Sequence, residues 1–358
     1  MTEGERSGWQ SLPPEIGRDE IAAWAPRIAR PVAITGATGL VGSHLASVLM
    51  SAGVRARLLV RDPARLLPSL RESSDVVIGD LEDASCLGRL VDGCGAVVHL
   101  AGRLRAGRAG DFDRTNRLGT EALVAALRER APQARLVHVS SLAAAGPSTE
   151  PAGKRPEDPP APISAYGRSK LAGENAARAH SGSWVILRPP AIYGPRDIDV
   201  LQFFRLVAKG LVPLPAGERW VSIAHVADVV RAILAAAADE SIAGVLHLGE
   251  PEPCEMRRLI SALAAAGGVR ARAISVPPVL VFAAGRVGDV LQRLGFRSVA
   301  VTSDKARELL ARHWSARTAE SLRSLGLGGF VPFADGARAT WAWYRQHRWL
   351  PHAKIRGV

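Results

Sequence analysis

Cysteine is scarce in this sequence, and its placement excludes two kinds of site. Of 358 residues only three are cysteines, Cys86, Cys94 and Cys254. They are far apart, form no Cys-x-x-Cys pair and lie in no cluster with histidine, so neither a disulfide framework nor a zinc site follows from them. We therefore expect no metal in the functional site.

Long apolar runs are also missing. The N-terminus has no apolar stretch of the kind that a signal peptide carries, and the most apolar C-terminal stretch, Val276 to Gly285, contains two prolines. This stretch is far short of the roughly 20 residues that span a bilayer. We expect no integral membrane segment and a cytoplasmic protein.

Positive charge is in excess, but it is not concentrated. A formal net charge of +12 on its own would suit a nucleic acid or an anionic membrane. The arginines are scattered along the whole chain, however, and no basic run is interleaved with aromatic residues. We interpret them as a solvated surface and predict no nucleic-acid partner.

Short apolar runs alternate with helical stretches from Pro31 onward. This pattern is typical of parallel strands joined by right-handed crossovers, with helices on both faces of the sheet. The predicted fold class is therefore α/β, a doubly wound parallel sheet (Rossmann fold) with a smaller C-terminal substrate lobe. The expected strands are 32–35, 55–60, 75–78, 96–100, 135–140 and 184–187, and the expected helices include 16–28, 40–51, 200–207, 226–238, 278–294 and 337–349.

The chain divides into three segments. Residues 1–30 are an N-terminal extension, residues 31–195 an NAD(P)-binding Rossmann domain, and residues 196–358 mostly a substrate-binding lobe, with about 220–250 returning to the sheet. The proline-rich stretch 147–162 cannot be helix or central strand. We expect it to be a loop that crosses the carboxyl edge of the sheet.

A glycine-rich turn follows the first expected strand, with the sequence Gly36-Ala37-Thr38-Gly39-Leu40-Val41-Gly42. Glycines at a strand-to-helix turn allow a tight bend and a close approach of a pyrophosphate, and the helix N-terminus offers unpaired N–H groups to the phosphates. A glycine-rich turn without a ligand is the alternative. The predicted cofactor contacts here are Gly36, Thr38, Gly39, Leu40 and Val41.

The spacing Gly-x-x-Gly-x-x-Gly differs from the general Gly-x-Gly-x-x-Gly fingerprint and resembles the turn of the short-chain dehydrogenases/reductases. Further motifs follow in the order of the extended subfamily, the NAD(P)-dependent epimerase/dehydratase family: Gly79-Asp80-Leu81, His99-Leu100-Ala101-Gly102, Asn116-Arg117-Leu118-Gly119-Thr120, Val139-Ser140-Ser141, Tyr166-Gly167-Arg168-Ser169-Lys170 and Arg188-Pro189-Pro190-Ala191-Ile192-Tyr193-Gly194-Pro195. The chain is most similar in character to members related to 3β-hydroxysteroid dehydrogenase and dihydroflavonol reductase.

Tyr166 and Lys170 are four residues apart and so share one helix face. A free phenol, with a pKa of about 10, is a poor acid at neutral pH, and a neighbouring ammonium lowers that pKa. Alone, this spacing is usually only a helix surface. The resemblance implies that Tyr166 transfers the proton, that Lys170 also holds the nicotinamide ribose, and that Ser141, with Ser140 as the alternative, orients the substrate oxygen.

The resemblance also implies the remaining cofactor contacts. They are Asp80 and Leu81 near the adenine, Pro189 near the nicotinamide carboxamide, and Leu100, Ala101, Gly102, Asn116 and Ile192 along the cofactor.

The choice of dinucleotide depends on the end of the second strand, Leu58-Leu59-Val60-Arg61-Asp62. NAD-specific sheets of this kind end the strand in an acidic residue that binds the ribose hydroxyls. If Val60 stands at that position, Arg61 can pair with a 2′-phosphate, and NADP(H) is favoured. If Asp62 stands there, NAD(H) is the cofactor, and both alignments stay open.

These features predict an NAD(P)-dependent oxidoreductase that transfers hydride between the nicotinamide and a secondary alcohol or ketone. The apolar stretch from Leu201 to Val212 would suit a hydrophobic, sterol- or flavonol-like small molecule, or it is simply lobe core. The alternative function is a nucleotide-sugar epimerase or dehydratase with bound NAD. It is disfavoured because Pro190, Ala191 and Ile192 stand where such enzymes usually carry an Asn. The oligomeric state is open and includes a homodimer.

Overall fold

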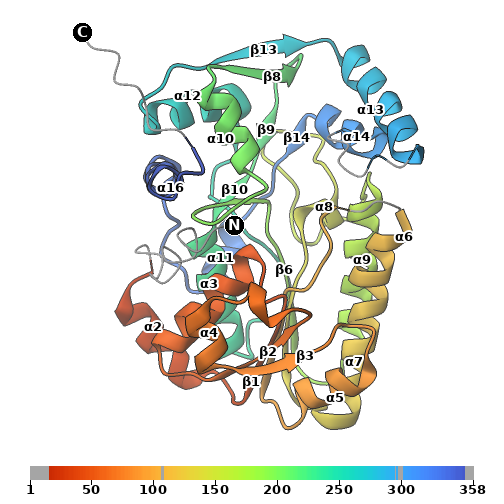
Figure 1. The fold of residues 1–358 in the computed structure, drawn as a ribbon, viewed down its shortest axis with the longest axis vertical. Coiled ribbons are helices and arrows are strands. Elements are labelled where there is room, and N and C mark those ends of the chain that lie inside the picture. The colour runs from red at the N-terminus through yellow and green to blue at the C-terminus, as the bar shows by residue number, and fades with distance from the viewer. Residues whose placement is uncertain (1–15, 106–108, 295, 297–300, 351–358) are drawn as a thin grey trace.

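A seven-stranded parallel sheet forms the centre of the molecule in the computed structural model (Figure 1). The structure describes residues 16–105, 109–294, 296 and 301–350. The sheet has the order β11-β6-β5-β4-β1-β2-β3 and comprises β1 (Val32–Thr35), β2 (Ala56–Val60), β3 (Asp75–Ile78), β4 (Ala96–His99), β5 (Arg135–Val139), β6 (Trp184–Arg188) and β11 (Gly244–His247). The doubly wound α/β fold predicted from the sequence is confirmed.

The strand order reverses between β1 and β4. The chain passes from β1 through β2 to β3 and then returns to β4 on the other side of β1. At such a switch point the crossovers leave in opposite directions, and a crevice opens outside the carboxyl ends of the strands. Ligand-binding residues are therefore expected directly after β1 and β4, where the Gly36 turn and Gly102 lie.

Helices cover both faces of the sheet (Figure 1). One face carries α3 (Leu40–Ser51), α4 (Pro68–Ser73) and α11 (Val226–Ala238), whose buried side chains share one apolar core with β1 and β2. The other face carries α5 (Ala84–Val91), α7 (Gly119–Arg130) and α9 (Ala165–Arg178). The strands are apolar on both sides because both faces are covered, which explains their continuous apolar runs.

The N-terminal extension contributes to the main core. Arg18–Trp24 forms α2, and Ala25–Arg27 continues as a 3₁₀ turn, since Pro26 has no backbone N–H for an α-helical hydrogen bond. The helix is therefore shorter than the 16–28 expected. Ile21 and Ile28 are buried in the same core as α3 and α11.

The C-terminal lobe has a second core. Its helices are α10 (Leu201–Ala208), α12 (Met256–Ala266) and α16 (Phe333–Gln346). Phe204, Trp341 and Tyr344 pack together between them, with ring centroids 5.1 to 5.2 Å apart around Phe204. At the outer end, β8 (Leu211–Pro215) pairs with β13 (Arg272–Val276), and α13 (Pro278–Arg293) packs on α14 (Ser303–Leu310) (Figure 1).

Short elements complete the described chain. They are η3 (Pro63–Arg65), α6 (Ala109–Asp113), the π-helical turn η4 (Arg114–Leu118), α8 (Leu142–Ala145), β7 (Ala191–Tyr193), β9 (Trp220–Val221), β10 (Ile223–His225), β12 (Cys254–Glu255), β14 (His313–Trp314) and α15 (Ala319–Ser324). The sequence predicted none of these short strands, because two or three residues show no period. The helix expected over 337–349 begins earlier, at Phe333. Among the described helices none is both long and apolar enough to cross a membrane.

Candidate active site

The turn between β1 and α3 is shaped by its glycines. Gly36 has a φ of +78°, and a Cβ there would lie 2.7 Å from the backbone nitrogen of Ala101. A Cβ on Gly42 would collide with the carbonyl group of Gly36. Both positions therefore require glycine, and the turn holds the N-terminus of α3, with its unpaired N–H groups, beside the end of β4. Such a cradle fits a pyrophosphate.

The other predicted residues of this turn differ in exposure. Thr38 and Leu40 are half-buried, and Gly39 is exposed and precedes the first residue of α3. Val41 is buried in the main core. Its side chain is thus a packing group, and only its backbone is placed to meet a ligand.

The end of β4 is tied to this turn by hydrogen bonds. The Thr35 hydroxyl oxygen accepts the N–H of Ala101 at 3.1 Å and lies 2.6 Å from Nδ1 of His99, while Nε2 of His99 lies 3.0 Å from the Thr120 hydroxyl. Burial lowers the pKa of His99 to about 3, and the charge of Lys170 lowers it further. His99 is therefore a neutral bridge between β1, β4 and α7.

Gly102, Asn116 and Lys170 meet just beyond β4. A Cβ on Gly102 would lie 3.2 Å from Oδ1 of Asn116 and 3.6 Å from Nζ of Lys170. Asn116 is buried in the π-helical turn η4, where its Nδ2 donates to the Ser169 hydroxyl at 2.9 Å and its Oδ1 accepts the N–H of Arg103 at 2.8 Å. Single π-helical turns are frequent at functional sites. Three predicted cofactor contacts thus converge at one point.

Tyr166 and Ser141 are hydrogen-bonded to each other across the start of α8 and α9. The Tyr166 ring also lies 5.9 Å from the ring of Phe112, between centroids. Burial raises the pKa of Tyr166 to about 12; the hydrogen bond from Ser141 lowers it, and the carboxylates of Glu308 and Asp199 raise it. The phenol is therefore protonated at neutral pH.

Lys170 lies one turn further along α9 and is buried. Its Nζ donates to the carbonyl oxygen of Val139 at 2.8 Å. Burial lowers its pKa to about 8, and the charge of Glu174 opposes this shift. The sequence predicted that the ammonium lowers the pKa of Tyr166, but in the structure that pKa is above its usual value, because Lys170 is directed to the β5 backbone and burial dominates at the phenol.

Glu174 holds Ser140 and Arg188 together beneath the candidate site, and the sequence did not predict this. It is fully buried, accepts the Ser140 hydroxyl at 2.6 Å, and accepts Nε and Nη2 of Arg188 at 2.8 and 2.7 Å. Ser140 is thereby part of a buried ion-pair network, whereas Ser141 lies against Tyr166. The available signal was the spacing of four residues between Lys170 and Glu174, which places them on one helix face.

The second and third strands present the residues predicted for the adenosine end. Asp62 follows β2 and caps η3, its carboxylate accepting the N–H of Ala64 at 3.0 Å. Arg61 is exposed and, within the described ranges, has no hydrogen-bond or ion-pair partner. Asp80 is exposed beyond β3, and Leu81 is buried. All four residues follow the carboxyl ends of β2 or β3, which lie at the same edge of the sheet as the glycine turn after β1.

The remaining predicted contacts are Pro189, which follows β6, Ile192 in β7, and Leu100, which follows β4. The carbonyl oxygen of Pro189 accepts the N–H of Leu142 at 2.8 Å, directly after Ser141. Ile192 and Leu100 are half-buried against the main core. Residues from β4, β5, β6 and α9 therefore meet at the carboxyl edge of the sheet, which is the edge that the topology favours for a ligand.

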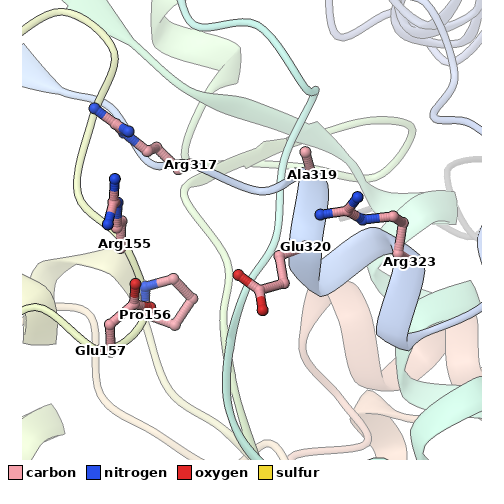
Figure 2. Close-up of a pocket in the computed structure, with 7 residues that line it drawn as sticks. All are labelled: Arg155, Pro156, Glu157, Arg317, Ala319, Glu320 and Arg323. Atoms are coloured by element: carbon pink, nitrogen blue, oxygen red, sulfur yellow. The ribbon is translucent and has the colours of Figure 1, made fainter.

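A pocket of about 270 Å³ lies between the proline-rich loop and α15 (Figure 2). It is lined by Arg155, Pro156, Glu157, Arg317, Ala319, Glu320 and Arg323. None of these residues is one of the predicted site residues. The stretch 147–162 contains no helix, as expected, and one side of this pocket is formed by it.

A glycine-rich turn at the switch point of a doubly wound parallel sheet is typical of proteins that bind a dinucleotide. The model of the NAD dependent epimerase/dehydratase family matches residues 32–249, which is more than half of the chain. The chain belongs to this family. It is an NAD(P)-dependent oxidoreductase of the extended short-chain dehydrogenase/reductase type, as the sequence predicted.

Individual relatives include both reductases and sugar-nucleotide enzymes. The chain is 36% identical to a ceramide reductase of Caulobacter vibrioides, over 89% of this chain and 96% of the relative. It is 30% identical to 4-hydroxy-2-methyl-3-oxo-4-farnesyl-3,4-dihydroquinoline-1-oxide ketoreductase of Stigmatella aurantiaca, over 86% and 94%. The solved structure of MoeE5 in complex with UDP-glucose and NAD superposes with a TM-score of 0.68 at 26% identity, covering 88% of this chain and 98% of that one.

Proposed function

We propose that this enzyme is an NADP(H)-linked reductase of an apolar ketone, with Ser141, Tyr166 and Lys170 at the reaction centre. The observation that carries the proposal is the hydrogen bond between Ser141 and the protonated phenol of Tyr166, with Lys170 one turn away on the same helix. The similarity to a ceramide reductase and to a ketoreductase of a farnesyl-bearing quinoline supports an apolar substrate with a long chain.

The glycine turn and Arg61 would hold the dinucleotide. The backbone N–H groups at the start of α3 would bind the pyrophosphate, and the missing Cβ of Gly36 lets the turn that presents them pack against the end of β4. Arg61 is exposed and free to pair with a 2′-phosphate, while the carboxylate of Asp62 is engaged by its own turn. This difference favours NADP(H) over NAD(H). When bound, the reduced nicotinamide supplies the hydride to the carbonyl carbon.

Ser141 and Tyr166 would act on the substrate oxygen. The Ser141 hydroxyl donates a hydrogen bond that orients the carbonyl, and Tyr166 transfers its phenolic proton to the same oxygen. Because burial keeps the pKa of Tyr166 at about 12, the phenol carries its proton at pH 7, which is the state that ketone reduction needs. Lys170, with a pKa of about 8, is mostly charged at pH 7 and would stabilise the phenolate that remains.

The cofactor proposal is tested by titrating the purified chain with NADPH and with NADH and following nicotinamide fluorescence. Losing a charge-assisted hydrogen bond to the 2′-phosphate costs about 1.5–3 kcal/mol, so Arg61→Ala should weaken NADPH binding about ten- to a hundredfold and leave NADH binding nearly unchanged. Arg71→Ala, also exposed but in α4, is the matched control and should behave as wild type. A preference of wild type for NADH, or NAD that copurifies, would overturn the proposal.

The substrate proposal is tested with long-chain ketones beside UDP- and dTDP-sugars. We expect NADPH oxidation with the ketones, and a loss of at least about a hundredfold in kcat for Tyr166→Phe with unchanged NADPH affinity. The second candidate function is a sugar-nucleotide epimerase or dehydratase, which the likeness to the UDP-glucose complex favours. Turnover of the sugars without ketone reduction would establish that function instead.

Two further expectations of the sequence, a cytoplasmic location and a homodimer, stay predictions. Fractionation of cells and light scattering of the purified chain would test them.

A further inference from the structure

Helix α13 buries small residues and exposes large apolar ones, which is the reverse of an ordinary surface helix. Its buried residues are Gly285 and Gly288, and the backbone at Gly285 lies so close to α14 that a Cβ there would be 2.9 Å from the Cβ of Ala306. Most of its large apolar residues point outward instead; Val279 is 69% exposed, and Leu294, the C-cap residue of the helix, is 70% exposed. A surface helix normally buries its large apolar side chains and exposes polar ones.

The exposed apolar residues form one continuous face. They are Val279, Leu280, Phe282, Val287, Val290, Leu291 and Leu294, which we call the α13 surface. Leu280, Val287 and Leu294 recur every seven residues, and Val279, Val290 and Leu294 at steps of eleven and four, so these five residues return to the same side of an α-helix. Phe282 lies at the edge of that side. Large contiguous apolar patches on a protein surface mark an interaction site.

The charges beside this face are positive. Arg286 and Arg293 are exposed on α13, and the guanidinium of Arg286 lies 5.9 Å from the ring centroid of Phe282. The acidic residue of the helix, Asp289, is turned inward, where it accepts the N–H of Ser303 at 3.0 Å. The apolar face of α13 is thus bordered by arginines, and the carboxylate of the helix does not point outward. Such a face complements an anionic lipid surface.

The neighbouring strands extend the same surface. In the β8–β13 pair, Leu211 lies beside Arg272 and Pro213 beside Ile274, and all four are exposed. Figure 1 shows this strand pair and α13 at the same end of the long axis of the molecule. The apolar and cationic character is therefore a property of one end of the protein and not of a single helix.

This end lies one helix away from the candidate reaction centre. Helix α13 packs on α14, and Asp304 of α14 accepts the backbone N–H of Ala165, the residue before Tyr166, at 2.8 Å. A long-chain molecule that left a bilayer at the α13 surface would thus be close to the start of α9 when its polar end left the lipid.

We propose that the α13 surface docks the enzyme on an anionic bilayer, from which it takes a lipid ketone. The docking part stands on the exposed residues alone, and only the identity of the cargo rests on the proposed function. The apolar side chains would insert at the boundary between headgroups and acyl chains, and Arg286 and Arg293 would pair with lipid phosphates.

The test is flotation of the full chain with vesicles of phosphatidylcholine alone and of phosphatidylcholine with phosphatidylglycerol. We expect binding to the anionic vesicles, weakened by salt. The variant Leu280→Gln/Val287→Gln/Leu294→Gln, which keeps good helix formers at exposed positions, should bind at least about tenfold more weakly. Arg286→Gln/Arg293→Gln should lose the preference for anionic vesicles, whereas the matched charge change Arg128→Gln/Arg130→Gln on α7 should not.

Three outcomes would overturn the docking proposal. The first is that wild type binds neither kind of vesicle, and the second is that wild type and the triple glutamine variant bind equally. The third is that wild type is a stable dimer and the triple variant a monomer, since a second copy of the chain would then cover the α13 surface. Activity separates this proposal from the proposed function. Variants of the α13 surface should reduce a short water-soluble ketone as fast as wild type and a vesicle-embedded ketone at least about tenfold more slowly. If wild type binds the vesicles but reduces no ketone, the docking proposal stands and the reductase proposal is rejected.

Discussion

Two adjacent serines at the end of β5 have different partners. The hydroxyl of Ser140 donates to Glu174, which also accepts two hydrogen bonds from Arg188, and all three side chains are buried. Ser141 is half-buried, caps α8 and is hydrogen-bonded to Tyr166. At the scale of single residues, two consecutive hydroxyl groups thus have different partners, one in a buried ion pair and the other at Tyr166.

Exchanging each serine for alanine should separate these roles. Ser141→Ala should lower kcat by about a hundredfold or more, because the substrate oxygen loses its hydrogen-bond donor. Ser140→Ala should keep kcat within about tenfold but lower the free energy of unfolding by about 1–3 kcal/mol, since a buried carboxylate loses a donor. Steady-state kinetics and urea unfolding of both variants check this. Full activity in Ser141→Ala would assign the catalytic role to another residue.

At the scale of elements, the glycine turn packs closely against the helix that follows it. A Cβ on Gly42 would collide with the carbonyl of Gly36, so Gly42→Ala must displace α3 from β1. We expect a loss of about 2 kcal/mol or more of unfolding free energy, together with weaker dinucleotide binding.

Gly88 of α5 provides the matched control. A Cβ there would meet nothing within 4 Å, and Gly88→Ala should stabilise the protein by about 0.4–1 kcal/mol without changing dinucleotide binding. Thermal unfolding and cofactor titration of both variants give the comparison. Equal effects of the two exchanges would show that the crowding at Gly42 relaxes without cost.

The strands of the main sheet were predictable because each is a short apolar run before a recognisable turn. Val32–Thr35 and Asp75–Ile78 have the bounds that the sequence predicted, and the other predicted strands of the sheet each differ by one residue at one end. The strand Gly244–His247 was not predicted. The candidate site was predictable to the extent that its residues lie in motifs of fixed spacing. The glycine turn and the Tyr166–Lys170 pair are examples, since each is contained in a few consecutive residues.

Other features could not be predicted because they depend on segments distant in the sequence. The ion pair of Glu174 with Arg188 joins a helix to a strand across 14 residues. No local sequence pattern in either segment predicts it. The side-chain amide of Asn116, in the π-helical turn, is held by Arg103 and by Ser169 of α9, which are 13 and 53 residues away in the sequence. The outward apolar face of α13 has an ordinary helical period, and only packing shows which side is buried.

At the scale of the whole molecule, one carboxylate on α11 links segments that are far apart in the sequence. Asp228 on α11 accepts the N–H of Val331 at 2.9 Å and Nη1 of Arg231 at 3.1 Å, and Arg231 in turn donates to Glu20 of α2. Burial raises the pKa of Asp228 to about 6, and burial likewise raises the pKa of Asp197 to about 6 and of Glu250 to about 7. Carboxyls with raised folded-state pKa values add stability as the pH falls toward 4, because the folded state then binds the extra proton more tightly.

Buried histidines act in the opposite direction. Burial lowers the pKa of five of them, to about 3 for His99, to about 4 for His225 and His247, and well below the usual value for His44 and His138. A histidine with a lowered folded-state pKa binds its proton more readily in the unfolded chain, so stability is lost as the pH falls below about 6.5. From pH 7 to pH 5 each histidine costs about 2 kcal/mol and each of the three carboxyls returns about 1.5 kcal/mol, so the histidines dominate.

We therefore expect the free energy of unfolding to fall by a few kcal/mol between pH 7 and pH 5, as measured by urea denaturation at constant ionic strength. His138 offers the sharpest variant, because within the described part of the chain neither of its ring nitrogens has a hydrogen-bond partner. His138→Leu should keep or raise the stability at pH 7, since no hydrogen bond is lost, and should reduce the acid loss by about 2 kcal/mol. A wild-type stability that rises toward pH 5 would mean that Asp197, Asp228 and Glu250 outweigh the histidines.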